Sequence, residues 1–158
     1  MPKHVATPSE DAQQNNAFLT SLPPELRMSS LDQSNIETAE AYVETMRERA
    51  QLELDYSPES LAVLDEHLSK QFPDGCMFDT TIQAVAAYVG EVIRRACGAE
   101  WMISDKYPPG VAVNGFFANV RAWAEKRFDP NEKGSLVEKF ERYTSELEKR
   151  ASTQRSEG

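Results

Sequence analysis

Cysteine is scarce in this sequence, and long apolar runs are absent. Only two cysteines, Cys76 and Cys97, occur among 158 residues, so a disulfide framework is excluded and a reducing compartment is indicated. The longest apolar run, Ala84–Val89, is far shorter than the roughly 20 residues that a membrane helix needs. The N-terminus contains no apolar stretch that resembles a signal peptide. We therefore expect a cytoplasmic protein without a membrane segment.

Basic side chains are also too few for a nucleic-acid-binding surface. The net charge is -9, whereas binding to phosphates depends on clustered Lys and Arg. The sequence has no phosphate-binding loop and no G-x-G-x-x-G, H-E-x-x-H or G-x-S-x-G motif. His67 and the two cysteines have no identifiable catalytic partner. These absences predict no nucleic-acid partner, no cofactor, no metal and no catalytic residue.

The length of the chain indicates a single domain. Residues 1–33 are rich in Ser, Pro, Gln and Asn, which is typical of a flexible N-terminal arm. Residues 34–150 carry the sustained apolar patterns and are predicted to form one globular domain. Residues 151–158 are polar and are predicted to be a disordered tail.

Apolar residues at three- and four-residue spacing predict five helices. Ser34 and Ser135 each open a capping box, and Ser57, which precedes Pro58, and Asp79 are predicted N-caps. A central helix from Asp79 to Cys97 is less polar on its outer side than a solvated helix should be. The predicted helices cover residues 34–54, 57–72, 79–97, a segment that ends near 128, and 135–150.

Short β-type runs lie between the third and fourth helices. Glu100–Ile103 and Val111–Val113 predict a hairpin, and Asn114-Gly115 is a tight-turn signal before a third short strand. The fold class is therefore predicted as α+β and predominantly helical, with a small antiparallel hairpin or three-stranded meander. Val89, Ile93 and Trp101 should be buried together, because the central helix leads directly into this hairpin.

Two short motifs in this region resemble those of a known group of proteins. The helix carries Tyr88-x-Gly90-Glu91, and the strand after it begins Gly98-x-x-Trp101. The chain resembles small bacterial α+β proteins of a domain-of-unknown-function group over about residues 55–140. The resemblance implies the fold and a bacterial source, and it suggests an immunity-like binding role.

The helix predicted at residues 34–54 carries an unusual row of like charges. Glu37, Glu40, Glu44 and Glu48 fall on one strip, where neighbouring carboxylates repel one another. This strip is either a solvated acidic face or a docking surface for a basic partner. Tyr107, in a Pro-rich loop, is a further candidate contact residue.

The central helix contains a second candidate site. Gly90 costs ~1 kcal/mol relative to Ala in a helix interior, so another backbone approaches closely or a small pocket lies there. Tyr88, Glu91, Arg95 and Trp101 would line such a pocket, although Glu91 and Arg95 also have the spacing of an ordinary intrahelical ion pair.

Two hypotheses about function follow. The favoured one is a non-catalytic protein-interaction domain of the immunity or adaptor type, whose partner has a basic surface. The alternative is a small enzyme or ligand-binding domain with its pocket near Tyr88, Glu91 and Trp101.

Overall fold

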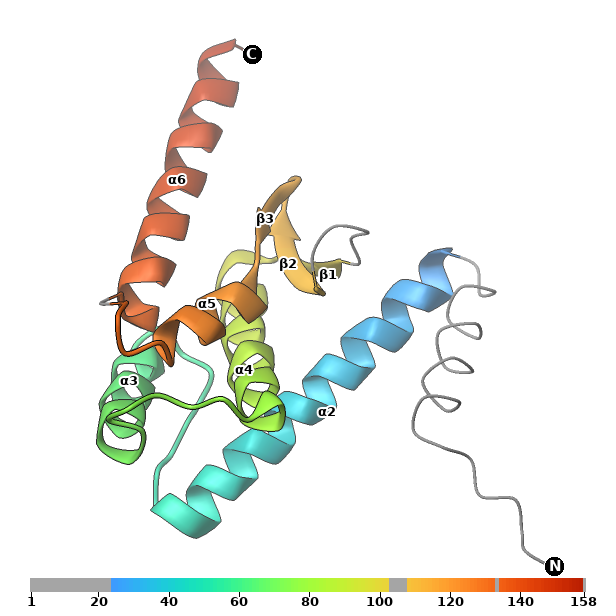
Figure 1. The fold of residues 1–158 in the computed structure, drawn as a ribbon. Coiled ribbons are helices and arrows are strands. Elements are labelled where there is room, and N and C mark those ends of the chain that lie inside the picture. Colours follow the sequence, from blue (N-terminus) through green and yellow to red (C-terminus); the bar gives the residue numbers. More distant parts are fainter. Residues whose placement is uncertain (1–23, 103–107, 133, 158) are drawn as a thin grey trace, which may run out of the picture.

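The computed structural model describes residues 24–102, 108–132 and 134–157, and Figure 1 shows their arrangement. These residues form five helices and one three-stranded antiparallel sheet, which confirms the predicted α+β class. The helices are α2 (Pro24–Ala50), α3 (Ser60–Gln71), α4 (Asp79–Cys97), α5 (Val120–Arg127) and α6 (Leu136–Glu157). The strands β1 (Glu100–Met102), β2 (Gly110–Val113) and β3 (Phe116–Ala118) lie between α4 and α5 in the chain.

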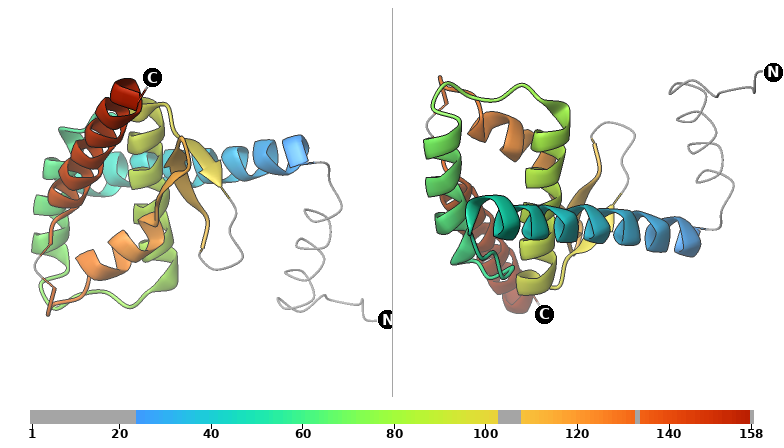
Figure 2. Two further views of the ribbon diagram at one scale, coloured as in Figure 1. Left: turned by 90° about the horizontal axis from the view of Figure 1, so that it is seen from above. Right: turned by 90° about the horizontal axis from the view of Figure 1, so that it is seen from below.

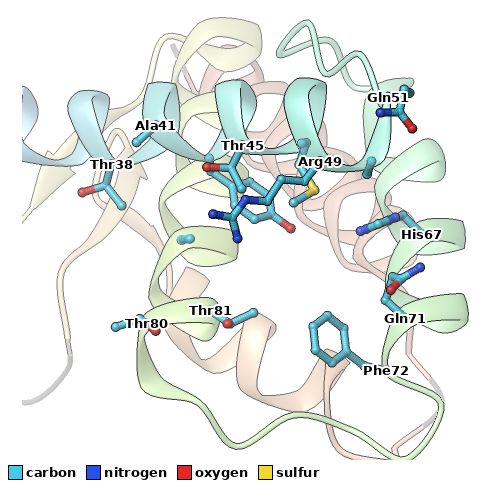
Figure 3. A pocket seen from close by; sticks show the side chains of 14 residues that line it. Thr38, Ala41, Thr45, Arg49, Gln51, His67, Gln71, Phe72, Thr80 and Thr81 are labelled. Carbon is cyan, nitrogen blue, oxygen red and sulfur yellow. The ribbon is translucent and has the colours of Figure 1, made fainter.

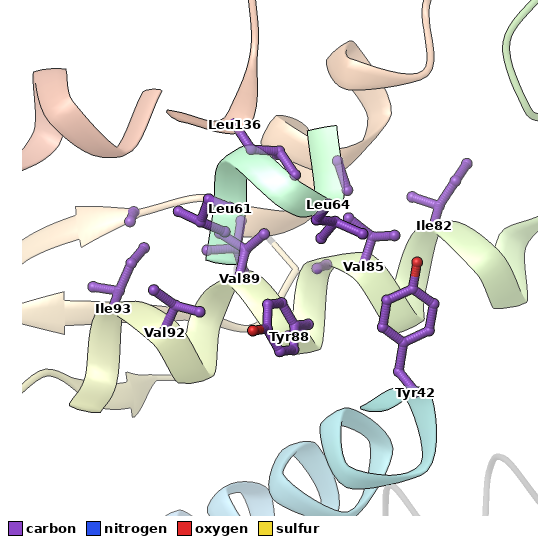
Figure 4. Packing of buried hydrophobic residues seen from close by; sticks show 14 of the residues in the cluster. Tyr42, Leu61, Leu64, Ile82, Val85, Tyr88, Val89, Val92, Ile93 and Leu136 are labelled. Atoms are coloured by element: carbon purple, nitrogen blue, oxygen red, sulfur yellow. The ribbon is translucent and has the colours of Figure 1, made fainter. Parts of the chain in front are cut away.

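Helix α4 is the centre of the fold. Every residue from Val85 to Ile93 is buried, because α2, α5 and the sheet pack around this helix (Figures 1 and 2). Figure 4 shows Tyr42 of α2, Leu61 and Leu64 of α3 and Leu136 of α6 gathered around the apolar side chains of α4. A fully buried aliphatic side chain contributes about 1.5–3 kcal/mol, so this helix carries much of the apolar stabilisation.

The sheet packs on α4 through one face only. Trp101 pairs with Val111, and Val111 pairs with Ala118. All three are buried, and their neighbours Glu100 and Met102 in β1 are exposed. Asn114 and Gly115 have φ values of 49° and 83°, as a type I′ hairpin turn requires. The tight turn predicted at Asn114-Gly115 is therefore confirmed.

Gly90 is explained by the approach of an aromatic ring. A Cβ atom at Gly90 would overlap the six-membered ring of Trp101. The side chains of Val89 and Ile93 are 0% exposed and that of Trp101 is 1% exposed, which confirms that the three are buried together. The approach of another backbone predicted at Gly90 is wrong, because an indole ring and not a second backbone occupies this space.

The predicted start of the first helix is wrong. Helix α2 begins at Pro24, so Ser34 lies in its interior, where its carbonyl oxygen accepts a hydrogen bond from Thr38 Oγ1 at 3.0 Å. Residues 25–33 contain no Pro or Gly, and Pro24 is compatible with the first turn of a helix. The predicted flexible arm, 1–33, is therefore helical from 24 onward. Its residues 1–23 lie outside the described part of the chain.

The predicted end of the last helix is also wrong, because α6 continues to Glu157. Residues 151–157 were expected to be a disordered tail, but no Pro or Gly interrupts the helix before the final residue. The predicted capping box at its start is confirmed. Ser135 Oγ accepts a hydrogen bond from the Glu138 amide at 3.1 Å, and Glu138 Oε2 lies 3.5 Å from the Ser135 amide.

The other predicted N-caps differ in detail. Ser57 Oγ accepts a hydrogen bond from the Ser60 amide at 3.2 Å, although α3 begins only at Ser60. Asp79 is the first residue of α4 and not its cap. Its carboxylate instead accepts a hydrogen bond from Arg121 Nη2 of α5 at 2.5 Å.

Asp65 joins three helices around a nearly buried carboxylate. Its Oδ1 and Oδ2 accept hydrogen bonds from the amides of Leu136 and Val137 at 3.0 and 3.1 Å, which caps the start of α6. Oδ1 also accepts from Arg127 Nε, in the last turn of α5, at 2.7 Å. Asp65 lies on α3, so one side chain fixes the relative positions of α3, α5 and α6.

We predict that Gly90→Ala destabilises the protein by about 1–3 kcal/mol, because the added methyl group overpacks against Trp101. Ala is the better helix former by ~1 kcal/mol, so the sign of the effect distinguishes packing from helix propensity. Urea denaturation measures it. In a Trp101→Leu background the same substitution should be neutral or stabilising. An equal loss in both backgrounds would show that the ring is not the cause.

We predict that Asp65→Asn destabilises the protein by about 2–4 kcal/mol. The amide cannot accept all three hydrogen bonds, and the guanidinium of Arg127 loses its counter-ion. Glu66→Gln is the matched control, because Glu66 lies next along α3 and pairs with Lys70 in solvent. The control should change the unfolding free energy by less than about 0.5 kcal/mol. Similar decreases in unfolding free energy for both variants would contradict the role of Asp65 in fixing the relative positions of α3, α5 and α6.

Candidate functional site

The acidic strip of α2 (Glu37, Glu40, Glu44 and Glu48) is exposed along its whole length. Glu44 lies 2.7 Å from Arg47 Nη1, and Arg47 Nε also bonds to Glu53 at 3.2 Å. Glu40 and Glu48 form no ion pair with any other residue that the structure describes. The strip therefore keeps a negative charge that is only partly neutralised.

A groove of about 970 Å³ lies beside the acidic strip, where α2, α3 and α4 meet (Figure 3). Its main apolar side chains come from α2, α4 and the loop after α3. These are Tyr42, Met46, Phe72 and Ala84. Its polar lining consists mainly of Thr38, Thr45, Arg49, His67, Gln71, Thr80 and Thr81. The groove thus offers an apolar floor within a ring of hydroxyl and amide groups.

The titratable groups of the groove are suited to binding rather than to proton transfer. Burial, with smaller contributions from Cys76 and Tyr88, raises the pKa of Tyr42, so its phenol stays protonated. Burial lowers the pKa of His67, so its imidazole is neutral at pH 7. No hydrogen bond from another described residue orients that imidazole. Arg49 is the cation of the groove, and it makes no ion pair within the described ranges.

The second group of predicted site residues forms a closed network around Glu91. This side chain is 0% exposed. Arg94 donates to its carboxylate from Nε at 2.7 Å and from Nη2 at 3.0 Å, Trp101 donates from Nε1 at 3.0 Å, and Arg95 donates from Nε at 3.2 Å. Burial raises the pKa of Glu91, but hydrogen bonds from Arg94 and Trp101 outweigh this effect and hold it below its usual range. The carboxylate is therefore ionised and fully engaged.

Tyr88 belongs to the same cluster through Tyr56. The Tyr88 hydroxyl accepts a hydrogen bond from the Tyr56 amide at 3.0 Å and shares one with Ser60 Oγ at 2.5 Å. The Tyr56 ring stacks on Tyr88 with 5.2 Å between centroids, and the Arg95 guanidinium covers its other face at 3.7 Å. The structure thus brings Tyr88, Glu91, Arg95 and Trp101 together in a packed joint. The groove described above is lined by other residues.

Tyr107 lies outside the described residues, so its predicted role as a contact residue has no structural counterpart here. The groove, in contrast, was missed by sequence reasoning. Helical periodicity places Met46 on the apolar stripe of α2 and does not single out Tyr42. The other walls come from α3 and α4, and periodicity within one helix does not reveal which faces of different helices leave a gap.

Comparisons with known proteins add no further assignment. No protein-family model, curated protein or solved structure matches this chain. The resemblance to a bacterial domain-of-unknown-function group therefore stays a prediction. Within the described ranges, no group of His, Cys, Asp or Glu side chains is placed to hold a metal ion.

We predict that Glu91→Gln destabilises the protein by about 1–3 kcal/mol near pH 7, because two guanidinium groups lose their counter-ion. The loss is moderate since Arg94 and Arg95 are partly exposed and stay hydrated. The folded pKa of Glu91 is lowered, so its stabilisation is present above the unfolded pKa and is lost as the pH falls through the folded value.

Urea denaturation over a pH series tests this. The difference in unfolding free energy between the parent and Glu91→Gln should be constant from pH 7 to about pH 5 and should become smaller below about pH 4. Glu100→Gln, an exposed change at the start of β1, should leave stability nearly unchanged. A difference in unfolding free energy that does not depend on pH would mean that the charge of Glu91 does not stabilise the fold.

Proposed function

We propose that this chain is a non-catalytic protein-interaction domain, and that its partner docks on the acidic strip of α2 and the adjoining groove. The observation that carries the proposal is their adjacency. Glu37, Glu44 and Glu48 lie on the outer face of α2, and the next face around the same helix presents Thr38, Thr45 and Arg49 to the groove. One ligand surface can therefore contact both.

The chemistry of the two parts defines the partner. Negative charge on the strip favours Lys or Arg side chains and increases the rate of association. The apolar floor formed by Tyr42, Met46 and Phe72 accommodates an apolar side chain. An amphipathic segment with one basic and one apolar side satisfies both requirements, as in helix-in-groove recognition. The partner is thus a protein with a basic, partly apolar docking segment.

The biological setting is part of the same proposal. The domain acts in the cytoplasm of a bacterium, as an immunity or adaptor protein that holds its partner without chemical change. The engaged state of the Glu91 carboxylate supports a non-catalytic role. No helix among the described residues has the length and apolar character needed to cross a membrane.

We predict that replacing Glu40, Glu44 and Glu48 together with Gln weakens partner binding without loss of stability. The exchange removes like-charge repulsion along α2, so the free energy of unfolding should stay the same or rise slightly. Association should become slower, and its dependence on salt should decrease. Affinity capture from the host extract identifies the partner, and surface plasmon resonance with the purified partner then gives the rate constants.

A second triple variant, Glu66→Gln, Glu100→Gln and Glu132→Gln, is the matched control, because it removes the same charge from exposed positions elsewhere. It should capture the same proteins as the parent. Thr45→Arg places a bulky side chain in the groove and should block binding with little effect on stability. Equal capture by the parent and all three variants would contradict the proposed surface.

A further inference from the structure

A second hollow, of about 490 Å³, lies where β3, α5 and α6 meet (Figure 1). Its lining combines aromatic and basic side chains, chiefly Phe116, Trp123, Lys126, Lys139, Arg142 and Arg150. We call it the basic-aromatic hollow. Its lining residues come from β3, α5 and α6, whereas those of the groove described above come from α2, α3, α4 and the loop after α3. The hollow is therefore separate from the surface proposed above.

The aromatic floor of the hollow is held rigidly. The Phe116 and Tyr143 rings stack with 4.7 Å between centroids and 6° between planes, and Trp123 meets Tyr143 edge-on at 6.0 Å. The Tyr143 hydroxyl donates a hydrogen bond to the Phe116 carbonyl oxygen at 2.6 Å. Phe116 and Trp123 remain half-buried. The Arg150 guanidinium lies over the Phe116 ring at 4.1 Å from its centroid, so Trp123 is the preorganised aromatic side chain that can receive an apolar side chain at little entropic cost.

Arg150 pairs with Glu146 at 3.7 Å, but the other three cations around this floor are unneutralised. Lys126, Lys139 and Arg142 form no ion pair with another residue in the described ranges. Elsewhere many basic side chains are paired, such as Arg121 with Asp79 and Arg127 with Asp65. In a chain with a net charge of -9, three unpaired cations at one aromatic hollow indicate an anionic ligand.

We propose that the basic-aromatic hollow binds a short acidic peptide segment of another protein. An apolar or aromatic side chain of the segment packs against Trp123, beside the Phe116 ring that Arg150 covers. Its carboxylates pair with Lys126, Lys139 and Arg142. This proposal stands independently of the acidic strip, because it concerns another face and the opposite charge. With both sites occupied, the domain bridges a basic and an acidic partner.

Single-stranded nucleic acid is the less suitable occupant, although aromatic and basic side chains also bind it. Such binding needs a positively charged path along several nucleotides. Here Glu146 lines the same hollow as the cations, and the acidic net charge repels a longer polyanion. A few carboxylates flanking an apolar residue match the size and charge of the site better.

The test uses the full chain and a fluorescein-labelled peptide, Asp-Glu-Leu-Asp-Glu-Phe-Asp-Glu. Anisotropy should show saturable binding with a Kd below about 1 mM that weakens with salt. The same peptide with Asn and Gln in place of Asp and Glu should bind at least about tenfold more weakly. Trp123 is half-buried and Trp101 is 1% exposed, so the acidic peptide should shift the tryptophan emission through Trp123. Trp123→Phe should abolish that shift.

Variants separate the site from the net charge. Lys139→Gln with Arg142→Gln should weaken peptide binding about tenfold, and Lys139→Arg with Arg142→Lys should retain it. Lys70→Gln with Lys149→Gln removes the same charge from exposed positions outside the hollow and should change binding less than about twofold. Melting curves of the Lys139 and Arg142 variants should match the parent, because neither side chain forms an ion pair with another described residue.

Four results would overturn the proposal. The first two are the absence of saturable peptide binding and an equal weakening of peptide binding by both pairs of Gln substitutions. The third is tighter binding of oligothymidylate than of the peptide. The fourth is self-association, seen in light scattering, that the Gln substitutions at Lys139 and Arg142 abolish. The last two would assign the hollow to nucleic acid or to the acidic strip of a second copy. These four measurements use the parent chain and the variants of the hollow. They do not depend on whether the acidic-strip variant loses its partner, so the two proposals fail separately.

Discussion

The contact between Trp101 and the bare backbone of Gly90 attaches the sheet to the central helix. The indole is 1% exposed and occupies the space where any other residue would place a Cβ atom. Its Nε1 donates to Glu91 one residue further along α4. Burying a carboxylate is costly unless it is paired and hydrogen-bonded. Arg94 and Arg95 meet that requirement from the next turn of the same helix. All the hydrogen bonds to the buried carboxylate therefore come from residues of α4 and β1.

The buried polar side chains of this fold mainly connect one element to another. Glu91 links α4 to β1, Asp65 links α3 to α5 and α6, and Tyr88 links α4 to the segment before α3. A buried group that is fully hydrogen-bonded makes the arrangement specific, but it is not available to a substrate. The surfaces that remain available lie on the outer faces of α2, α5 and α6. This is the physical reason for proposing recognition rather than catalysis.

The two proposed surfaces share a principle but differ in charge. Each combines an apolar floor, built from side chains of several elements, with charges that have no full partner in the described ranges. The acidic strip follows from one helix and is visible in the sequence. The basic-aromatic hollow unites β3, α5 and α6, and Lys126 and Arg142 meet only there. Opposite charges on separate faces of α4 suit a protein that connects two partners.

The sequence by itself determined the elements and the periodic features. The helix around Val85–Ile93, the Asn114-Gly115 turn, the Ser135 cap and the exposure of the acidic strip all depend on residues close together in the chain. Both errors at the helix ends are also local. Ser34 has the pattern of a cap, but residues 25–33 contain no Pro or Gly that interrupts a helix, and neither do residues 151–157. Only the tertiary structure decided what Glu91 does, since its role depends on the side of α4 that Trp101 covers. It also decided where hollows open, because packing between elements distant in sequence leaves those gaps, and no periodicity within one element encodes them.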